Sequence, residues 1–131
     1  MIGLDTNILV RYLAQDDDVQ AAMATKLMEQ SLSESDPGFI SIVAMVETAW
    51  VLERAYGLPD REIAAAIERI LATDVIVVQQ EQDVFTAMIA LRDGRGSFAD
   101  ALIGVLGAEA GCTRTLAFDR KASRLSYFEL C

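Results

Sequence analysis

The 131-residue chain alternates short apolar runs with longer segments of helical periodicity. Each short run is continuously apolar, whereas a strand with one solvated face would alternate apolar and polar residues. Continuous apolar runs are typical of strands that are buried in a parallel sheet. We therefore predict five strands, of which the last is the weakest, at residues 1–4, 38–42, 75–78, 115–118 and 126–130.

Between these runs, apolar residues recur every three or four positions, which predicts amphipathic helices. Helices are expected over residues 6–13, 17–32 and 99–110, after the strand at 38–42, and on either side of the strand at 75–78. Asp60 follows Pro59 and is the expected N-cap of one of them. The predicted inward-facing residues are Val19, Met23, Leu27 and Met28 in the second helix, Ile63, Ile67, Ile70 and Leu71 after Asp60, and Val84, Phe85, Met88 and Ile89 after the third strand.

The alternation of strands and helices predicts an α/β fold, with a single three-layer α/β/α domain over residues 1–131. The sheet is expected to be mainly parallel, with four to five strands. In such folds, ligands bind beyond the carboxyl ends of the strands, and the connecting helices begin at that same edge. Residues at strand ends and in first helical turns are therefore candidates for a functional site.

Composition narrows the possible chemistry, because the chain has no histidine. This excludes Ser/His/Asp and Cys/His triads, histidine-ligated zinc or haem, and histidine acid/base pairs. Cys112 and Cys131 have no metal-binding or disulfide spacing and are expected to be free thiols. Apolar residues make up 53% of the chain, but no apolar run is long enough to span a bilayer and no signal peptide is recognisable. We expect a cytoplasmic protein without membrane contact.

Three acidic residues stand at predicted strand ends or helix starts. Asp5 follows the first strand, Asp119 follows the fourth, and Asp100 comes three residues after Ser97 at the start of a helix. Each has a structural interpretation, because Asp5 and Asp119 can cap helices and Asp100 fits a capping box with Ser97. Considered singly, Asp5 is equally well explained as a cap or a functional group, and the cap is favoured for the other two.

Glu47 has no comparable structural explanation. It lies about a turn and a half into the helix that follows the second strand, which is too far in for a cap. Its neighbours at three- and four-residue spacing are all apolar, so no cation of its own helix can pair with it. Burial of an unpaired carboxylate costs several kcal/mol, which predicts a long-range partner such as Arg11 or Arg92, a pKa raised enough to keep the group protonated, or a functional role.

Together, the four carboxylates favour a metal site. If they converge at the carboxyl edge of the sheet, their mutual repulsion raises their pKa values and destabilises the fold unless a divalent cation lies among them. Oxygen ligands without histidine or cysteine select hard ions, namely Mg²⁺, Mn²⁺ or Ca²⁺. A carboxylate-held Mg²⁺ or Mn²⁺ ion is suited to phosphoryl transfer.

These motifs resemble the PIN-domain nucleases and, within them, the VapC-type toxins of bacterial toxin–antitoxin pairs. The resemblance covers essentially the whole chain and rests on the order and spacing of four segments. They are Leu4-Asp5-Thr6-Asn7-Ile8-Leu9, Val46-Glu47-Thr48, Phe98-Ala99-Asp100-Ala101-Leu102-Ile103 and Phe118-Asp119-Arg120.

The resemblance implies specific roles for these residues. Thr6 and Asn7 match the polar pair that orients the first Asp. Family members commonly carry Thr or Ser two residues before the last acid, where this chain has Ala117, so a hydrogen bond near Asp119 is lost. The resemblance further implies a cognate antitoxin protein and a homodimer. The quartet that it implies as catalytic ligands of one or two Mg²⁺ or Mn²⁺ ions is Asp5, Glu47, Asp100 and Asp119.

Charge is segregated along the chain. Residues 1–91 carry 5 basic and 15 acidic side chains, whereas residues 92–124 carry 6 basic and 4 acidic ones. Within the second segment, Arg92, Arg95 and Arg120 flank the last two acids of the quartet and are candidate phosphate-binding residues. A solvated loop explains Arg92 and Arg95 equally well. Outside the quartet, Trp50, Tyr56, Met23, Leu27 and Met28 are expected in the core, with a partner groove as the second interpretation.

The preferred hypothesis is a Mg²⁺- or Mn²⁺-dependent endoribonuclease that acts as the toxin of a toxin–antitoxin pair and hydrolyses RNA with a metal-activated water. The alternative is a PIN-like module that binds RNA or protein and has lost catalysis, which Ala117 favours slightly. A phosphoacceptor receiver domain is disfavoured, because that fold needs an Asp at the end of its third strand, where this chain has Gln79 and Gln80.

Overall fold

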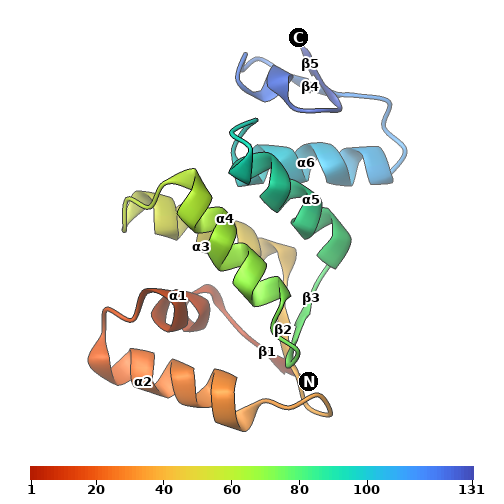
Figure 1. The fold of residues 1–131 in the computed structure, drawn as a ribbon. Helices are drawn as coiled ribbons and strands as arrows, with labels where there is room; N and C mark the ends of the chain where they lie inside the picture. The colour runs from red at the N-terminus through yellow and green to blue at the C-terminus, as the bar shows by residue number, and fades with distance from the viewer.

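The computed structural model describes every residue from Met1 to Cys131 and confirms the α/β class (Figure 1). A π-helical turn, Leu27–Ser31, extends the second helix, and a 3₁₀ turn, Ala122–Arg124, precedes the last strand. The strands are β1 (Ile2–Gly3), β2 (Gly38–Ile40), β3 (Ile76–Val78), β4 (Thr115–Ala117) and β5 (Phe128–Leu130). The α-helices are α1 (Thr6–Ala14), α2 (Asp18–Lys26), α3 (Ile42–Arg54), α4 (Asp60–Leu71), α5 (Glu81–Arg92) and α6 (Phe98–Glu109).

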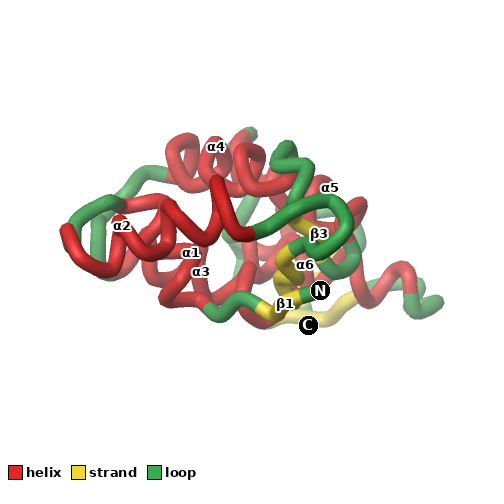
Figure 2. Tube along the Cα trace, turned by 90° about the horizontal axis from the view of Figure 1, so that it is seen from below, coloured by secondary structure: helices red, strands yellow, loops and turns green.

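All strand pairs are parallel, as predicted, but the strands are divided between two sheets. One sheet has the order β1-β2-β3, and the other contains β4 and β5. Figure 1 shows the three-stranded sheet near the N-terminus and the β4–β5 sheet at the other end of the molecule, with α5 and α6 between them. In the view from below, β1 and the C-terminal strand overlap in projection, because the view runs along the direction in which Figure 1 separates them (Figure 2). As a result, β1 and β4 each have one unpaired edge.

The hydrophobic core lies mainly among α3, α4, α5 and α6, with contributions from α1 and the three-stranded sheet. The predicted stripe of α4 is confirmed, because Ile63, Ile67 and Ile70 are all buried. On α6, Gly104 allows β5 to approach closely, since a β-carbon there would stand 2.6 Å from the Phe128 ring. The largest fully buried side chains are Leu9, Ile40, Met45, Leu52, Ile67, Met88, Leu102, Val84 and Thr48.

The predicted inner face of the second helix was wrong. Val19 and Met23 are 71% and 68% exposed, and Ala21 and Ala24 are buried instead. Small alanines allow α2 to approach α1 closely, so the contacting face is set by side-chain size as well as hydrophobicity. Met28 is buried as predicted, at the π-helical turn.

On α5, Phe85 was also predicted to face inward, but its side chain is 46% exposed. The helix packs between α4 and α6 through a face that includes Val84, Ala87 and Met88, all fully buried. Phe85 lies outside that face. A four-residue apolar cluster at helical spacing thus identified α5 correctly but overestimated the width of its buried face.

Local capping rules account for most helix starts. The side chains of Asp5, Asp17, Ser41 and Ser97 each accept a hydrogen bond from a backbone N–H in the first turn of their helix. Asp60 is an exception to the prediction, because it is the first residue of α4 and the N-cap is Pro59. Proline fixes its own φ and provides no side-chain acceptor, so Asp60 instead places a carboxylate at the positive end of the helix.

A polar network joins α1, the loop before α2 and the end of α3. The Tyr56 hydroxyl donates to Asp16 at 2.7 Å, and Arg11 lies 3.2 Å from the same carboxylate. The hydrogen bond from Tyr56, assisted by Arg11, holds the pKa of Asp16 below its ordinary value, and the same bond raises the pKa of Tyr56. None of the helices is both long enough and apolar enough to cross a lipid bilayer.

Candidate functional site

The carboxylates of Asp5 and Glu47 face one shallow hollow beyond the ends of β1 and β2. We call it the Asp5–Glu47 hollow. Its lining contains no lysine and no arginine. The residues that line it are Gly3, Leu4, Asp5, Thr6, Phe39, Ser41, Val43, Ala44 and Glu47.

Local structure positions both acids of this hollow. The Asp5 carboxylate caps α1 by accepting a hydrogen bond from the Ile8 N–H at 3.1 Å, so the capping interpretation is confirmed. The Thr6 hydroxyl donates to Oε1 of Glu47 at 2.9 Å and thereby ties the start of α1 to α3. The resemblance assigned Thr6 to the orientation of Asp5, but in the structure Thr6 holds Glu47. Asn7 is exposed on the same helix start.

The expectation of a buried Glu47 was wrong, because its side chain is exposed. Exposure removes the desolvation cost that made an unpaired carboxylate difficult to explain. Neither suggested long-range partner is present, since Arg11 pairs with Asp16 and Arg92 pairs with Asp93. Glu47 is therefore a solvent-accessible carboxylate whose hydrogen bond comes from the neutral hydroxyl of Thr6.

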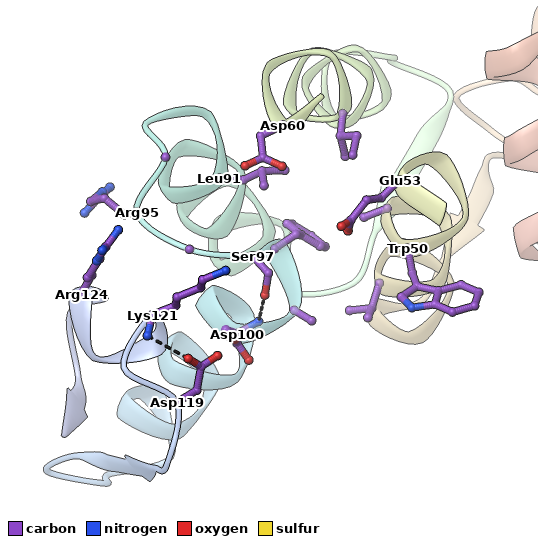
Figure 3. Close-up of a pocket in the computed structure, with 17 residues that line it drawn as sticks. Trp50, Glu53, Asp60, Leu91, Arg95, Ser97, Asp100, Asp119, Lys121 and Arg124 are labelled. Carbon is purple, nitrogen blue, oxygen red and sulfur yellow. Dashed lines mark hydrogen bonds between the residues drawn. The ribbon is translucent and has the colours of Figure 1, made fainter. Parts of the chain in front are cut away.

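The other two acids lie in a second and larger depression, a cleft of about 430 Å³. We call it the Asp100–Asp119 cleft. Figure 3 shows the two carboxylates beside one another at one end, with Glu53 and Trp50 of α3 on the opposite side. Basic residues also line this cleft, in contrast to the first hollow: Arg95, Lys121 and Arg124.

Capping explains only part of the arrangement around Asp100. The Ser97 hydroxyl accepts from the Asp100 N–H at 3.1 Å, which is one half of the predicted capping box. The reciprocal bond, from the Ser97 N–H to the Asp100 carboxylate, is not formed. The carboxylate therefore faces the cleft (Figure 3). It lies in the first turn of α6, at the N-terminal end of the helix, where the helix dipole favours negative charge.

Asp119 is exposed and is held by the loop that follows β4. Its Oδ1 accepts from the Lys121 N–H at 2.8 Å, so it orders a turn and caps no α-helix. Ala117, two residues earlier, ends β4 and provides no hydroxyl. The hydrogen bond that the resemblance would place near this acid therefore cannot come from residue 117.

The structure separates the three candidate phosphate-binding residues. Arg95 lines the cleft, and its only ion-pair partner, Asp93, is 3.9 Å away on an exposed loop. Arg92 and Arg120 lie outside the lining, and Arg92 pairs with Asp93. Lys121 and Arg124 line the cleft instead, and neither makes an ion pair. Their sequence proximity to Asp119 was the available signal.

Trp50 was expected in the core, but its side chain is 56% exposed at the rim of the cleft. Tyr56, also expected in the core, is half-buried, and its hydroxyl belongs to the network with Asp16. Trp50 occupies the same exposed side of α3 as Glu47, three residues earlier. The exposure of Trp50 could not be predicted from the apolar run at 42–52, because α3 also carries apolar residues on its solvated side.

The four predicted ligands are thus brought together as two pairs. No group of three or more aspartate, glutamate, cysteine or histidine side chains is close enough to hold a metal ion. The donor chemistry suits a hard cation, since all donors are carboxylate oxygens, but neither pair forms a complete site alone. Helix α3 connects the two depressions, because Glu47 lines the hollow and Glu53 lines the cleft.

Comparison with known proteins identifies the family. A sequence model of the PIN domain matches residues 2–126, which includes all four acids. No curated protein matches the chain.

Proposed function

The chain belongs to the PIN domain family, a family of nuclease folds, and on that premise we propose that it is an endoribonuclease dependent on Mg²⁺ or Mn²⁺. The carrying observation is that Asp5, Glu47, Asp100 and Asp119 are all accessible at strand ends or in the first two turns of helices. Their carboxylates are not neutralised by ion pairs.

The proposal requires the two acid pairs to come together, and pairing between the free edges of β1 and β4 would bring them together. Asp5 follows the last residue of β1 by two positions, and Asp119 follows the last residue of β4 by two positions. If the free edges of β1 and β4 pair in parallel, the two acids become neighbours at one sheet edge. In support, Leu116 of β4 and Phe118 just after it are 55% and 87% exposed, more than Val77 of β3 and Leu130 of β5, which are 43% exposed each; Ile2 of β1 is 41% exposed.

In the joined arrangement, the four carboxylates would hold the divalent cation. The cation would supply a polarised water and would offset negative charge on the scissile phosphate. The residues of this chain have distinct supporting tasks. Thr6 orients Glu47, the Ile8 N–H orients Asp5, and the Lys121 N–H orients Asp119.

We further propose that the nuclease is a cytoplasmic toxin, forms a homodimer and is inhibited by a cognate antitoxin protein. The VapC-like motifs support the toxin role. Exposed apolar side chains on α2, Val19 and Met23, support a protein partner, because such residues are usually covered when they are clustered. Expression in a bacterial host, with and without the open reading frame adjacent to its gene, tests the role: growth arrest relieved by the neighbour is expected. The absence of arrest at confirmed expression, or arrest that the neighbour leaves unchanged, contradicts it.

The decisive experiment for the enzyme is cleavage of a structured RNA by the purified protein. We expect cleavage with Mg²⁺ or Mn²⁺, loss of cleavage in EDTA, and loss in Asp5→Asn. Asp74→Asn, an exposed acid outside both depressions, is the matched control and should cleave normally. Activity that survives both EDTA and Asp5→Asn rules out the proposal. RNA binding without any cleavage favours the alternative, a binding module that has lost catalysis.

A further inference from the structure

We propose that Trp50 is a base-stacking residue that makes the site selective for single-stranded RNA. In this arrangement, one unpaired base stacks on the indole, while Lys121, Arg124 and Arg95, on the opposite side of the cleft, hold phosphates farther along the same strand. The inference rests on the proposed function and deepens it, because it specifies the form of RNA and the residue that selects it.

The exposure of Trp50 is unusual for its residue type. Tryptophan is highly buried on average, but this side chain is 56% exposed and is the only tryptophan in the chain. The Arg54 guanidinium lies 5.5 Å from the centroid of the indole ring, at cation–π distance. Arg54 thus occupies one side of the ring. Figure 3 shows the indole at the rim of the cleft and turned outward, so a base can reach it from solvent.

The surroundings of Trp50 favour a nucleic acid over another apolar ligand. The cleft that Trp50 borders contains Asp100 and Asp119 and is lined by three basic side chains, two of them without an ion pair. A basic groove combined with an exposed aromatic ring is the arrangement that binds single strands, since every base presents a π-face. An apolar ligand would leave these cations without a partner.

The position of Trp50 on α3 relates base binding to the acidic residues. Glu47 and Trp50 are three residues apart on the exposed side of one helix, about one turn. This spacing belongs to the helix itself and is unchanged if β1 and β4 pair. A strand that leads from the cleft towards Glu47 therefore passes Trp50. A duplex cannot stack there in the same way, because its bases are paired and stacked on one another.

The test measures RNA binding in a non-cleaving background, Asp100→Asn, with a single-stranded 12-nucleotide RNA at low salt. Trp50→Ala should weaken binding about 5- to 150-fold, the range for loss of one base stack. Trp50→Phe retains a ring and should weaken it less. Phe85→Ala removes an exposed aromatic residue outside the cleft and is the matched control. Lys121→Gln should reduce the slope of log Kd against log salt by about 0.7.

A second readout uses the fluorescence of the single tryptophan in the same background. An RNA that contains bases should quench it, whereas an abasic ribose-phosphate oligomer should bind through its phosphates without quenching. A blunt RNA duplex should bind equally to the background protein and to its Trp50→Ala variant. This readout remains informative if Trp50→Ala fails to fold.

The outcomes separate the two proposals. If the wild-type protein cleaves RNA but binding does not depend on Trp50 and no quenching occurs, the stacking role is wrong and the nuclease proposal stands. If Trp50→Ala disrupts capture of a protein partner but leaves RNA binding unchanged, the ring is a protein contact and the stacking role is also wrong. If the wild-type protein neither binds nor cleaves RNA, both proposals fail.

Discussion

The two acidic depressions of this protein differ in the charges that surround them. The Asp5–Glu47 hollow has carboxylates, small residues and hydroxyls but no basic side chain, whereas the Asp100–Asp119 cleft combines its acids with Arg95, Lys121 and Arg124. The first is suited to a cation alone. The second can also accept the phosphates of a polyanion, because its cations lie next to its acids.

This difference in charge follows from the uneven distribution of acidic and basic residues along the chain. The hollow is built from residues before position 91, where acidic side chains outnumber basic ones by three to one, and the cations of the cleft come from residues 95–124. An overall charge of −9 therefore does not exclude a nucleic-acid ligand. The distribution of charge between the two depressions is the relevant quantity.

The largest expected effect tests whether the two depressions act as one catalytic site. Glu47→Gln in the hollow and Asp100→Asn in the cleft should each lower the rate of RNA cleavage by about 100-fold or more. The double variant should be little worse than either single variant, because residues that act as a unit are not additive. Initial rates under saturating Mg²⁺ measure this, with Asp74→Asn as the control.

Additive effects would indicate two sites that act independently. Full activity of Asp100→Asn would restrict catalysis to the hollow and contradict the joined arrangement. Circular dichroism of each variant establishes that it is folded, so that a lost rate can be attributed to the site.

A second prediction concerns a covalent link between the two sheets, whose expected effect is a change in gel mobility and not in the cleavage rate. Gly3→Cys and Ala117→Cys, in a background with Cys112→Ser and Cys131→Ser, place one thiol on each free edge. A β-carbon at Gly3 meets nothing within 4 Å, so the substitution fits. Paired strands bring α-carbons within the range of about 4.4–6.8 Å that a disulfide requires. We expect an intramolecular disulfide on a non-reducing gel, with RNA cleavage retained.

The single-cysteine variant Gly3→Cys is the control, because it can cross-link only between two molecules. A cross-linked dimer of the double-cysteine protein would mean that β4 pairs with β1 of another copy. Failure to cross-link, or loss of cleavage that reduction restores, would show that the depressions do not meet in the active enzyme.

The smallest expected effect concerns the stability of the fold at the contact between α5 and α6, two of the helices that line the cleft. Glu109 at the end of α6 lies against Asp83 at the start of α5, and the hydrogen bond that protonated Glu109 makes with the Asp83 carboxyl raises the pKa of Glu109. A raised folded-state pKa means that protonation favours the folded state. This contribution is present below the ordinary pKa of Glu and is lost as the pH rises through the raised value.

Glu109→Gln should therefore unfold at a slightly higher urea concentration than the wild type at pH 7, and the difference should disappear near pH 4. Urea midpoints at the two pH values measure this. Glu29→Gln, an exposed acid on the distant π-helical turn, should show no such pH-dependent gain. An equal gain at both pH values would contradict a raised pKa of Glu109 through its contact with Asp83.

The sequence by itself determined the elements and most of their boundaries. Asp5, Asp17, Ser41 and Ser97 begin helices by hydrogen bonds within three residues, and the five apolar runs all contain strands. Such features depend on neighbours along the chain, so local patterns predict them. The family-like spacing of the four acids is likewise a property of the sequence.

Only the tertiary structure decided which side chains face solvent and which acids share a depression. Trp50 and Val19 are exposed, Ala21 is buried, and Glu47 meets Thr6 across 41 residues of chain. These outcomes depend on which helices pack against one another and on which strand edges pair. The division of the sheet between β1 and β4 is the clearest case, because parallel pairing is non-local and leaves no local signal in the sequence that specifies the partner of an edge strand.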